Sequence, residues 1–333
     1  MGLTSNFDGT DVSQTNAHIK LSYATCINRP VTSHSWKEDK QMKDVLKTIA
    51  PLNTEAFKQL HEQKGPLEGT AKHKALEVKS GFGCRTLLGE MMHACAIHRP
   101  DIGCAITLLS KFSSGPSACH CACPKNVAQH LSVTRDQGIQ FARPLQNSDP
   151  EPLKSQSPEI MHATEKLPPH LEPVPQGKLV GFADAACAND LAKKRSTTGC
   201  VFTHLGGATV CRSETQLLTA LGSAETEFIA AVTAAKTAKC IRLILAELGF
   251  EQNGPTPACK DNKPVTDIVA LQKPTEQTHH TDMQFFAIQN WAHNSKDTLL
   301  SHIPGVIDPS DDLTKPLRRT LLHKRHARHI MGH

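Results

Sequence analysis

The sequence contains no uninterrupted apolar run approaching the ~18 residues of a membrane-spanning helix. Its N-terminus also lacks the basic stretch and apolar segment that together mark a secretory signal. Met1 and Gly2 are compatible with a myristoylation start, but Asn6 stands where that signal needs serine or threonine. These absences predict an intracellular protein with reduced thiols and no membrane partner. The net charge of +5 is compatible with a polyanionic partner without requiring one.

Separated pairs of zinc ligands are also missing, although the chain has 12 cysteines. Structural zinc usually needs four ligands, commonly arranged as two separated pairs. Cys119, His120 and Cys121 are adjacent, so they cannot all point at one ion from regular structure. Other cysteines upstream, such as Cys84 and Cys104, occur singly. The pattern therefore favours neither a zinc site nor, without a secretory signal, structural disulfides.

Composition and periodicity divide the 333 residues into two main parts. Residues 1–146 show helical spacing of apolar side chains, for example at Leu46 and Ile49, and contain no catalytic constellation. Residues 147–176 hold seven prolines in polar sequence, which predicts a semi-extended linker rather than a packed loop. Residues 177–317 form the second part. Residues 318–333 are basic, and we expect a disordered tail there.

The second part shows strand and helix patterns in the order β-β-β-α-β-α-β. Gly206-Gly207 predicts a tight turn between two of the strands, Ser223 is a candidate helix cap, and Gly249 is a candidate helix stop. The strands are expected at 178–183, 199–205, 208–213, 257–260 and 299–303, and the helices at 223–248, 265–271 and 282–293. Three antiparallel strands followed by alternating elements are typical of the α/β ribonuclease H-like fold, a mixed sheet flanked by helices.

An ordered set of acidic residues accompanies these elements: Asp184, Glu227, Asp261 and Asp311. Asp184 and Asp261 each follow an apolar strand candidate, and Glu227 lies on the small-residue face of the long helix. A two-metal nuclease needs carboxylates that converge from separate elements onto one edge of a sheet. Mg²⁺ prefers such hard oxygen ligands and needs neither histidine nor cysteine. The ordered set therefore predicts a two-metal site.

Each acidic position also has an ordinary structural interpretation. Glu225 points about 200° away from Glu227 on a helix, and the helix dipole alone explains a negative charge there. Asp261 is also a candidate cap for the following helix. Asp311 and Asp312 together are typical of a solvated turn. No single position is specific, whereas the ordered set is.

Several motifs resemble the copia-type retrotransposon polyprotein, namely the end of its reverse transcriptase and its ribonuclease H domain. The motifs are CRTLLGEMMHACAIHRPDIGCAITLLSKF (84–112), FADAACANDLAKKRSTTGCVF (182–202), ALGSAETEFIAAVTAAK (220–236), KDNKPV (260–265), TDMQFFAIQNW (281–291) and DPSDDLTKPL (308–317). They are similar to family patterns such as R-P-D-I-x-x-A-V, R-K-S-T-S-G-Y-V-F and S-S-T-E-A-E-Y. Their order along residues 65–330 makes the resemblance specific. The helical first part then corresponds to a thumb or connection remnant of the reverse transcriptase.

The resemblance implies that Asp184, Glu227, Asp261 and Asp311 are catalytic and bind two Mg²⁺ ions, with Mn²⁺ as an alternative. Asp311 rather than Asp312 is implied because the family's aspartate lies two residues before Leu-Thr-Lys-Pro. The implied activity is endonucleolytic hydrolysis of the RNA strand of RNA–DNA hybrids during reverse transcription. The implied partners are the hybrid and the rest of a reverse transcriptase. The implied location is a cytoplasmic virus-like particle or the nucleus.

Three consecutive basic residues, Lys193, Lys194 and Arg195, are the candidates for gripping nucleic-acid phosphates. A solvated turn explains them equally well. A DDE-type integrase or transposase with the same fold is less favoured, because that chemistry usually places its glutamate on a late helix, whereas Glu227 lies on an early one.

The sequence also departs from the family pattern. The paired-aspartate Y-x-D-D motif of the polymerase is absent, so DNA synthesis is not expected. Family aromatic positions are occupied here by Cys84, His93, Cys104, Cys121, Cys187 and Cys200, and Tyr23 is the one tyrosine in the chain. Each such exchange in a core removes buried surface and costs stability. The alternative hypothesis is therefore a truncated, catalytically silent and poorly folded transposon relict that retains residual nucleic-acid binding.

Overall fold

The computed structural model describes residues 5–143 except 8, 25–50 and 53, residues 177–316 except 191–192 and 271–281, and residues 327 and 329–332. The expected linker at 147–176 and the helical pattern at Leu46 and Ile49 lie outside these ranges. No helix in the described ranges is both long and apolar enough to cross a membrane.

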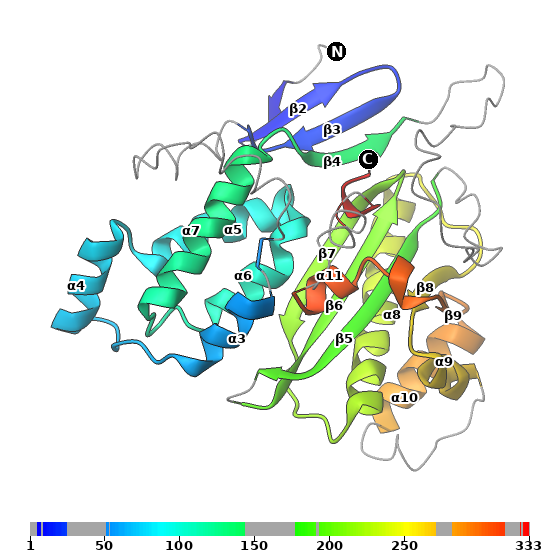
Figure 1. The fold of residues 1–333 in the computed structure, drawn as a ribbon. Helices are drawn as coiled ribbons and strands as arrows, with labels where there is room; N and C mark the ends of the chain where they lie inside the picture. Colours follow the sequence, from blue (N-terminus) through cyan, green and yellow to red (C-terminus); the bar gives the residue numbers. More distant parts are fainter. Residues whose placement is uncertain are drawn as a thin grey trace.

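A five-stranded mixed sheet organises the second part of the chain, with strand order β7-β6-β5-β8-β9 (Figure 1). Strands β5, β6 and β7 are antiparallel, and β8 and β9 run parallel to β5. The strand bounds are β5 Val180–Asp190, β6 Arg195–His204, β7 Gly207–Thr215, β8 Thr256–Lys260 and β9 Thr298–His302. This order is the ribonuclease H-like arrangement that the sequence predicts, so the α/β fold class is confirmed.

Helices cover both faces of this sheet because its strands bury apolar side chains on both sides. Helix α8 (Ser223–Glu247) packs on one face through Ala234 and Ala238, whose small side chains let it approach Ala183 closely. The short helix α11 (Asp311–Thr314) lies over the opposite face, where Leu313 joins a core cluster with Val180 (Figure 1). The remaining helical elements of this part are α9 Lys263–Ala270, α10 Asp282–Gln289, the π-helical turn Asn290–Asn294 and the 3₁₀ turn Gly305–Ile307.

Local details correct two expectations. Strand β5 extends to Asp190, so Asp184 lies within a strand rather than after one. The N-cap of α8 is Gly222, and Ser223 is already its first helical residue. Glu225 instead serves the helix start, because its carboxylate accepts a hydrogen bond from the Leu221 backbone N–H at 2.6 Å. The structural interpretation of Glu225 is therefore sufficient.

The first part is mainly helical, as the sequence predicts, and it also contains a small antiparallel sheet with the order β1-β2-β3-β4. Its strands are β1 Asn6–Phe7, β2 Thr10–Gln14, β3 His18–Ser22 and β4 Gly138–Ala142. The helical elements are α3 Thr54–Glu62, α4 Ala71–Ser80, α5 Cys84–Ile97, the 3₁₀ turn Pro100–Ile102, α6 Gly103–Ser110 and α7 Ala118–Val133. They enclose one hydrophobic core that includes Cys84, Cys104 and Cys121, three of the cysteines that the sequence resemblance aligns with aromatic positions.

His120, which the zinc interpretation would use, caps helix α7 instead. Its Nδ1 accepts a hydrogen bond from the Ser117 backbone N–H at 2.9 Å, and its Nε2 lies 2.7 Å from the carbonyl oxygen of Leu60. Ser117 in turn accepts from the His120 backbone N–H, which completes a capping box. All cysteines in the described part of the chain are free.

The two parts contact each other at several points. Thr107 of α6 donates a hydrogen bond to the Ser213 carbonyl of β7 at 2.7 Å. The Ala142 backbone N–H at the end of β4 donates to the Leu205 carbonyl at 2.7 Å. Ile330 near the C-terminus is fully buried in the same core cluster as Leu313. For Ile330 this burial differs from the disordered tail that the sequence predicts, and most of residues 318–333 lies outside the described ranges.

Candidate active site

Three of the four predicted acidic residues meet at one place in the second part. Asp184 comes from β5, Glu227 from the second turn of α8, and Asp261 directly follows β8. One carboxylate oxygen from each lies within 4.8 Å of the others, and this is the one group of three or more potential metal ligands in the described residues. Asp184 is buried, with 2% of its surface exposed. The structure therefore brings together acids that are 77 positions apart at their extremes.

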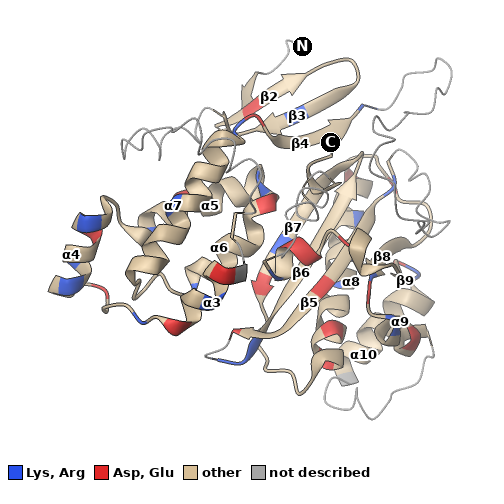
Figure 2. Ribbon diagram, viewed as in Figure 1, with Lys and Arg blue, Asp and Glu red and all other residues tan. Residues whose placement is uncertain are grey.

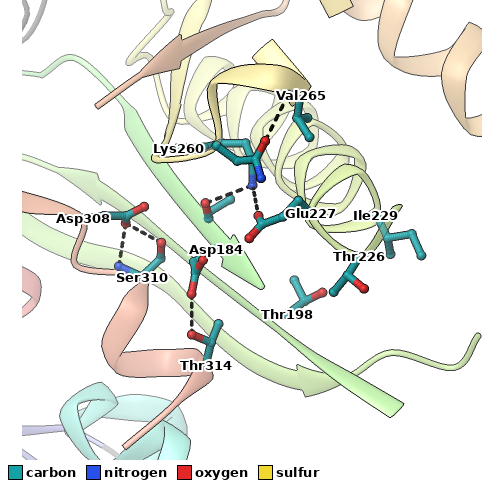
Figure 3. A network of polar contacts seen from close by, with 12 residues as sticks. Asp184, Thr198, Thr226, Glu227, Ile229, Lys260, Val265, Asp308, Ser310 and Thr314 are labelled. Carbon is teal, nitrogen blue, oxygen red and sulfur yellow. Dashed lines mark hydrogen bonds and ion pairs between the residues drawn. The ribbon is translucent and has the colours of Figure 1, made fainter. Parts of the chain in front are cut away.

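Asp184 is held by the C-terminal helix α11 and the residue after it. The Thr314 hydroxyl donates a hydrogen bond to Asp184 Oδ2 (Figure 3). Lys315 Nζ lies 3.5 Å from the same oxygen. Burial alone would raise the pKa of Asp184. The charge of Lys315 and the hydrogen bond from Thr314 outweigh burial and hold its pKa below the ordinary value. Asp184 is therefore ionised at neutral pH.

Glu227 is bound to a buried lysine that immediately precedes Asp261. Lys260 Nζ donates to Glu227 Oε2 at 2.8 Å and to the Ala183 carbonyl at 3.3 Å (Figure 3). None of Lys260 is exposed to solvent. Burial raises the pKa of Glu227, the nearby charges of Asp184 and Asp261 add to the increase, and Lys260 opposes it.

Asp311 lies beside the three-acid group and is linked to it through Lys315. Lys315 Nζ is 2.7 Å from Asp311 Oδ1, so one ammonium group contacts both Asp311 and Asp184. Burial and the negative charge of Asp184 raise the pKa of Asp311 to about 7. Burial raises the pKa of the Cys104 thiol in α6, and the negative charge of the neighbouring Asp312 raises it further. The Lys315 ammonium group that Asp311 shares with Asp184 favours Asp311 over Asp312 as the fourth acid.

A further buried acid, Asp308, supports the segment that carries Asp311. Its Oδ1 accepts hydrogen bonds from the backbone N–H and the hydroxyl of Ser310 (Figure 3). Burial raises the pKa of Asp308 well above its ordinary value. The two hydrogen bonds with Ser310 hold the turn before α11.

Of the predicted phosphate-binding residues, Lys193 and Lys194 lie in the turn before β6, and Arg195 is the first residue of β6. Lys193 and Lys194 are exposed, and the Lys193 backbone N–H donates to Asp190 Oδ1 at 3.0 Å. Strand β5 is irregular between Ala186 and Asp190. Asp184 pairs with Gly199 and Asp190 with Arg195, and these partners are four positions apart on β6, which corresponds to about 13 Å. Figure 2 shows acidic residues along β5 and near α11, and basic residues at the β5–β6 turn. The basic turn is thus separate from the acidic group on the same strand.

Lys260, Thr314 and Lys315 are functional candidates that the sequence reasoning did not identify. Lys260 ends an otherwise apolar strand, and a lysine buried there needs a charged partner. Its position in the sequence therefore could have predicted an acidic partner. Lys315 lies four residues after Asp311, a spacing that places both on one side of a helical turn. Thr314 gave no signal, since its partner Asp184 is 130 residues away.

The carboxylates fit a divalent cation by their chemistry. They supply hard oxygen donors from three elements, which is the ligand set that Mg²⁺ and Mn²⁺ accept. Lys260 departs from such a set, because its ammonium group already occupies one oxygen of Glu227.

Similarity to known proteins extends along most of the chain. No protein-family model matches it. It is 26% identical over 274 residues to the retrovirus-related Pol polyprotein from transposon TNT 1-94 of Nicotiana tabacum, covering 82% of this chain and 18% of that protein. It is 23% identical over 281 residues to the corresponding polyprotein from transposon RE1 of Arabidopsis thaliana, covering 84% of this chain and 17% of that protein. The chain therefore spans less than a fifth of either polyprotein.

A shorter relative matches over most of its own length. The chain is 30% identical over 143 residues to secreted RxLR effector protein 161 of Plasmopara viticola, covering 43% of this chain and 80% of that protein.

Among solved structures, ribonuclease H1 from the halophilic archaeon Halobacterium salinarum matches 41% of this chain and 94% of its own, with 14% identity and a TM-score of 0.30. LC11 ribonuclease H1 in complex with an RNA/DNA hybrid matches 41% and 94%, with 13% identity and a TM-score of 0.32.

Proposed function

The chain belongs to the family of the retrovirus-related Pol polyproteins of transposons, and from this premise we propose a function. We propose that its ribonuclease H-like domain cleaves the RNA strand of RNA–DNA hybrids with the help of divalent cations, Mg²⁺ or Mn²⁺. The observation that carries the proposal is the convergence of Asp184, Glu227 and Asp261 within 4.8 Å. The partners proposed are the hybrid and the rest of a reverse transcriptase, in a cytoplasmic virus-like particle or the nucleus.

The candidate ligands for divalent cations are the four acids Asp184, Glu227, Asp261 and Asp311. Divalent cations bound there supply the positive charge that activates an attacking water and offsets charge on the scissile phosphate. Asp184 presents an ionised carboxylate at neutral pH, which Thr314 keeps in one orientation. Without a bound cation, burial and the charge of Asp184 raise the pKa of Asp311 to about 7, and a cation bound there would favour its ionised form.

The basic residues Lys193, Lys194 and Arg195 are proposed to bind the phosphate backbone several nucleotides from the cleaved bond. The distance of about 13 Å between Asp184 and the end of β5 corresponds to roughly four nucleotides at about 3.4 Å each. Both lysines are exposed, so phosphate contact costs them little desolvation. Replacing both by glutamine is expected to weaken hybrid binding and to lessen its dependence on salt.

The test uses the full-length chain and a hybrid whose RNA strand carries a 5′ label. We expect RNA cleavage that requires Mg²⁺ or Mn²⁺, that is lost in Asp261→Asn, and that persists in Asp267→Asn. Asp267 is the matched control, because it is an exposed aspartate on the adjacent helix α9. If a folded chain leaves the hybrid intact under both metals, the proposed activity is wrong.

A second candidate function is that of a catalytically silent relict that keeps residual nucleic-acid binding. The observation that favours it is the ion pair between Lys260 and Glu227 inside the acidic group. Hybrid binding that depends on Lys193 and Lys194, in a folded chain without cleavage, would support this alternative.

A further inference from the structure

Lys260 is the feature of the acidic site that the proposed chemistry does not use. Its side chain is fully buried, and its ammonium group contacts Glu227 Oε2 at 2.8 Å and the Ala183 carbonyl at 3.3 Å. A charged side chain without solvent access keeps its partner, because leaving either charge unpaired in the interior is costly. The ion pair is therefore a fixed part of the site.

Lys315 differs from Lys260 in this respect. It also contacts two of the acids, Asp184 and Asp311, but 45% of its side chain is exposed. A half-exposed lysine on a flexible stem can move into solvent when another cation arrives. Lys260 has no such path, so of these two ammonium groups only Lys260 is fixed.

Charge balance limits what the site accepts. When all four acids are ionised they carry four negative charges, which two divalent cations would neutralise. The fixed ammonium of Lys260 already offsets one of them and engages an oxygen of Glu227. A cation bound to that same oxygen would lie within about 5 Å of the ammonium nitrogen, given metal–oxygen distances of about 2.1 Å. Even at the dielectric constant of bulk water, repulsion at that distance weakens binding by more than about tenfold.

We propose that Lys260 is an internal counter-ion that withholds Glu227 from metal binding, so that this chain takes one divalent cation, held mainly by Asp184 and Asp261. The inference rests on the proposed function only in taking the acidic group as a site for divalent cations. In this proposal Lys260 positions the Glu227 carboxylate and limits the number of divalent cations that the site binds.

The first experiment measures Mn²⁺ binding to the full-length chain by isothermal titration calorimetry. We expect one bound ion in the wild type, and in Lys260→Met either a second ion or at least about tenfold tighter binding. Lys263→Met is the matched control, because it removes the same charge from an exposed position three residues away. The proposal is overturned if Lys260→Met binds Mn²⁺ no more tightly than Lys263→Met and gains no ion, or if the wild type binds two ions.

A second measurement does not depend on the folding of the Lys260 variant. In the wild-type background, Glu227→Gln is expected to change Mn²⁺ affinity by less than about threefold, because Lys260 already engages that side chain. Asp261→Asn is expected to weaken binding by at least about tenfold. Equal losses in the two variants would contradict the proposal.

Both readouts are independent of catalysis. A chain that binds Mn²⁺ as described but leaves hybrids intact refutes the proposed function and keeps the inference. A chain that cleaves hybrids while Lys260→Met shows no gain keeps the function and refutes the inference.

Discussion

Replacing Asp101 by asparagine is expected to destabilise the protein by about 3–5 kcal/mol, the cost of breaking a buried ion pair from one side. Asp101 receives two hydrogen bonds from Arg99, from Nε to Oδ1 at 2.9 Å and from Nη2 to Oδ2 at 2.7 Å. The two side chains are 0% and 1% exposed, so an unpaired guanidinium group cannot reach water. Two contacts of Arg99 with Thr134 remain, but neither supplies a negative charge.

The magnitude is large because an ordinary domain has only about 5–15 kcal/mol of total stability. The assay is urea unfolding followed by far-UV circular dichroism, with Glu68→Gln as the control. Glu68 pairs with Arg85 at 3.0 Å, but these side chains are 52% and 71% exposed, so the expected loss is only about 0–1 kcal/mol. If Asp101→Asn costs no more than Glu68→Gln, the reasoning about burial is wrong.

The same ion pair predicts how stability depends on acid. Burial would raise the pKa of Asp101, but the charge of Arg99 outweighs it and holds the pKa far below the ordinary value of 3.8. The pair's contribution is therefore fully present above pH 4 and declines as the pH falls below that value. Urea midpoints of the wild type are expected to approach those of Asp101→Asn only in strong acid.

Three further predictions concern the acidic site. Gly199→Ala is expected to destabilise the protein by about 1–3 kcal/mol in urea unfolding, because its Cβ would lie 2.7 Å from Thr314 Cγ2 and 2.8 Å from Leu313 Cβ. A Cβ at Gly89 would meet open space, so the control Gly89→Ala should differ from the wild type by less than about 1 kcal/mol. Asp311 has a raised pKa of about 7, so the stability of the wild type without metal should fall as the pH rises from about 4 to 7. Asp311→Asn should remove that part of the pH dependence. Urea midpoints that change in parallel with pH in both proteins would contradict this prediction. Thr314→Val removes a charge-assisted hydrogen bond to Asp184 and should slow the initial rate of hybrid cleavage about tenfold. Its circular dichroism spectrum should match that of the wild type. An unchanged rate would show that the hydroxyl does not position Asp184.

Much of the second part could be predicted from sequence because its signals are local. The turn at Gly206 has the positive φ that glycine adopts without strain, and Gly249 ends α8 in the same conformation. The order of acids relative to strands and helix was sufficient to name Asp184, Glu227 and Asp261 as a group. The partners of these acids could not be predicted, because Lys260 and Thr314 reach them only through the folded sheet.

The small sheet of the first part shows the same limit. Strands β2 and β3 are neighbours in sequence and pair with each other, but β3 also pairs with β4, so that His18 lies opposite Ala142. Periodicity within either strand carries no information about a partner more than 100 residues away. The burial of Ile330 in a basic segment is equally non-local, since its neighbours Val180 and Leu313 come from β5 and α11.

The contacts between the two parts have a consequence for how the protein would respond to a protease. Cutting the backbone between Arg143 and Gly177 would leave Thr107 bonded to Ser213, the Ala142 N–H bonded to the Leu205 carbonyl, and α6 packed beside β7. The two fragments would therefore stay together as a nicked complex that co-elutes at the mass of the whole chain. Covalent continuity through the proline-rich segment is then not what maintains the assembly, and the two halves, made separately, are expected to reassociate.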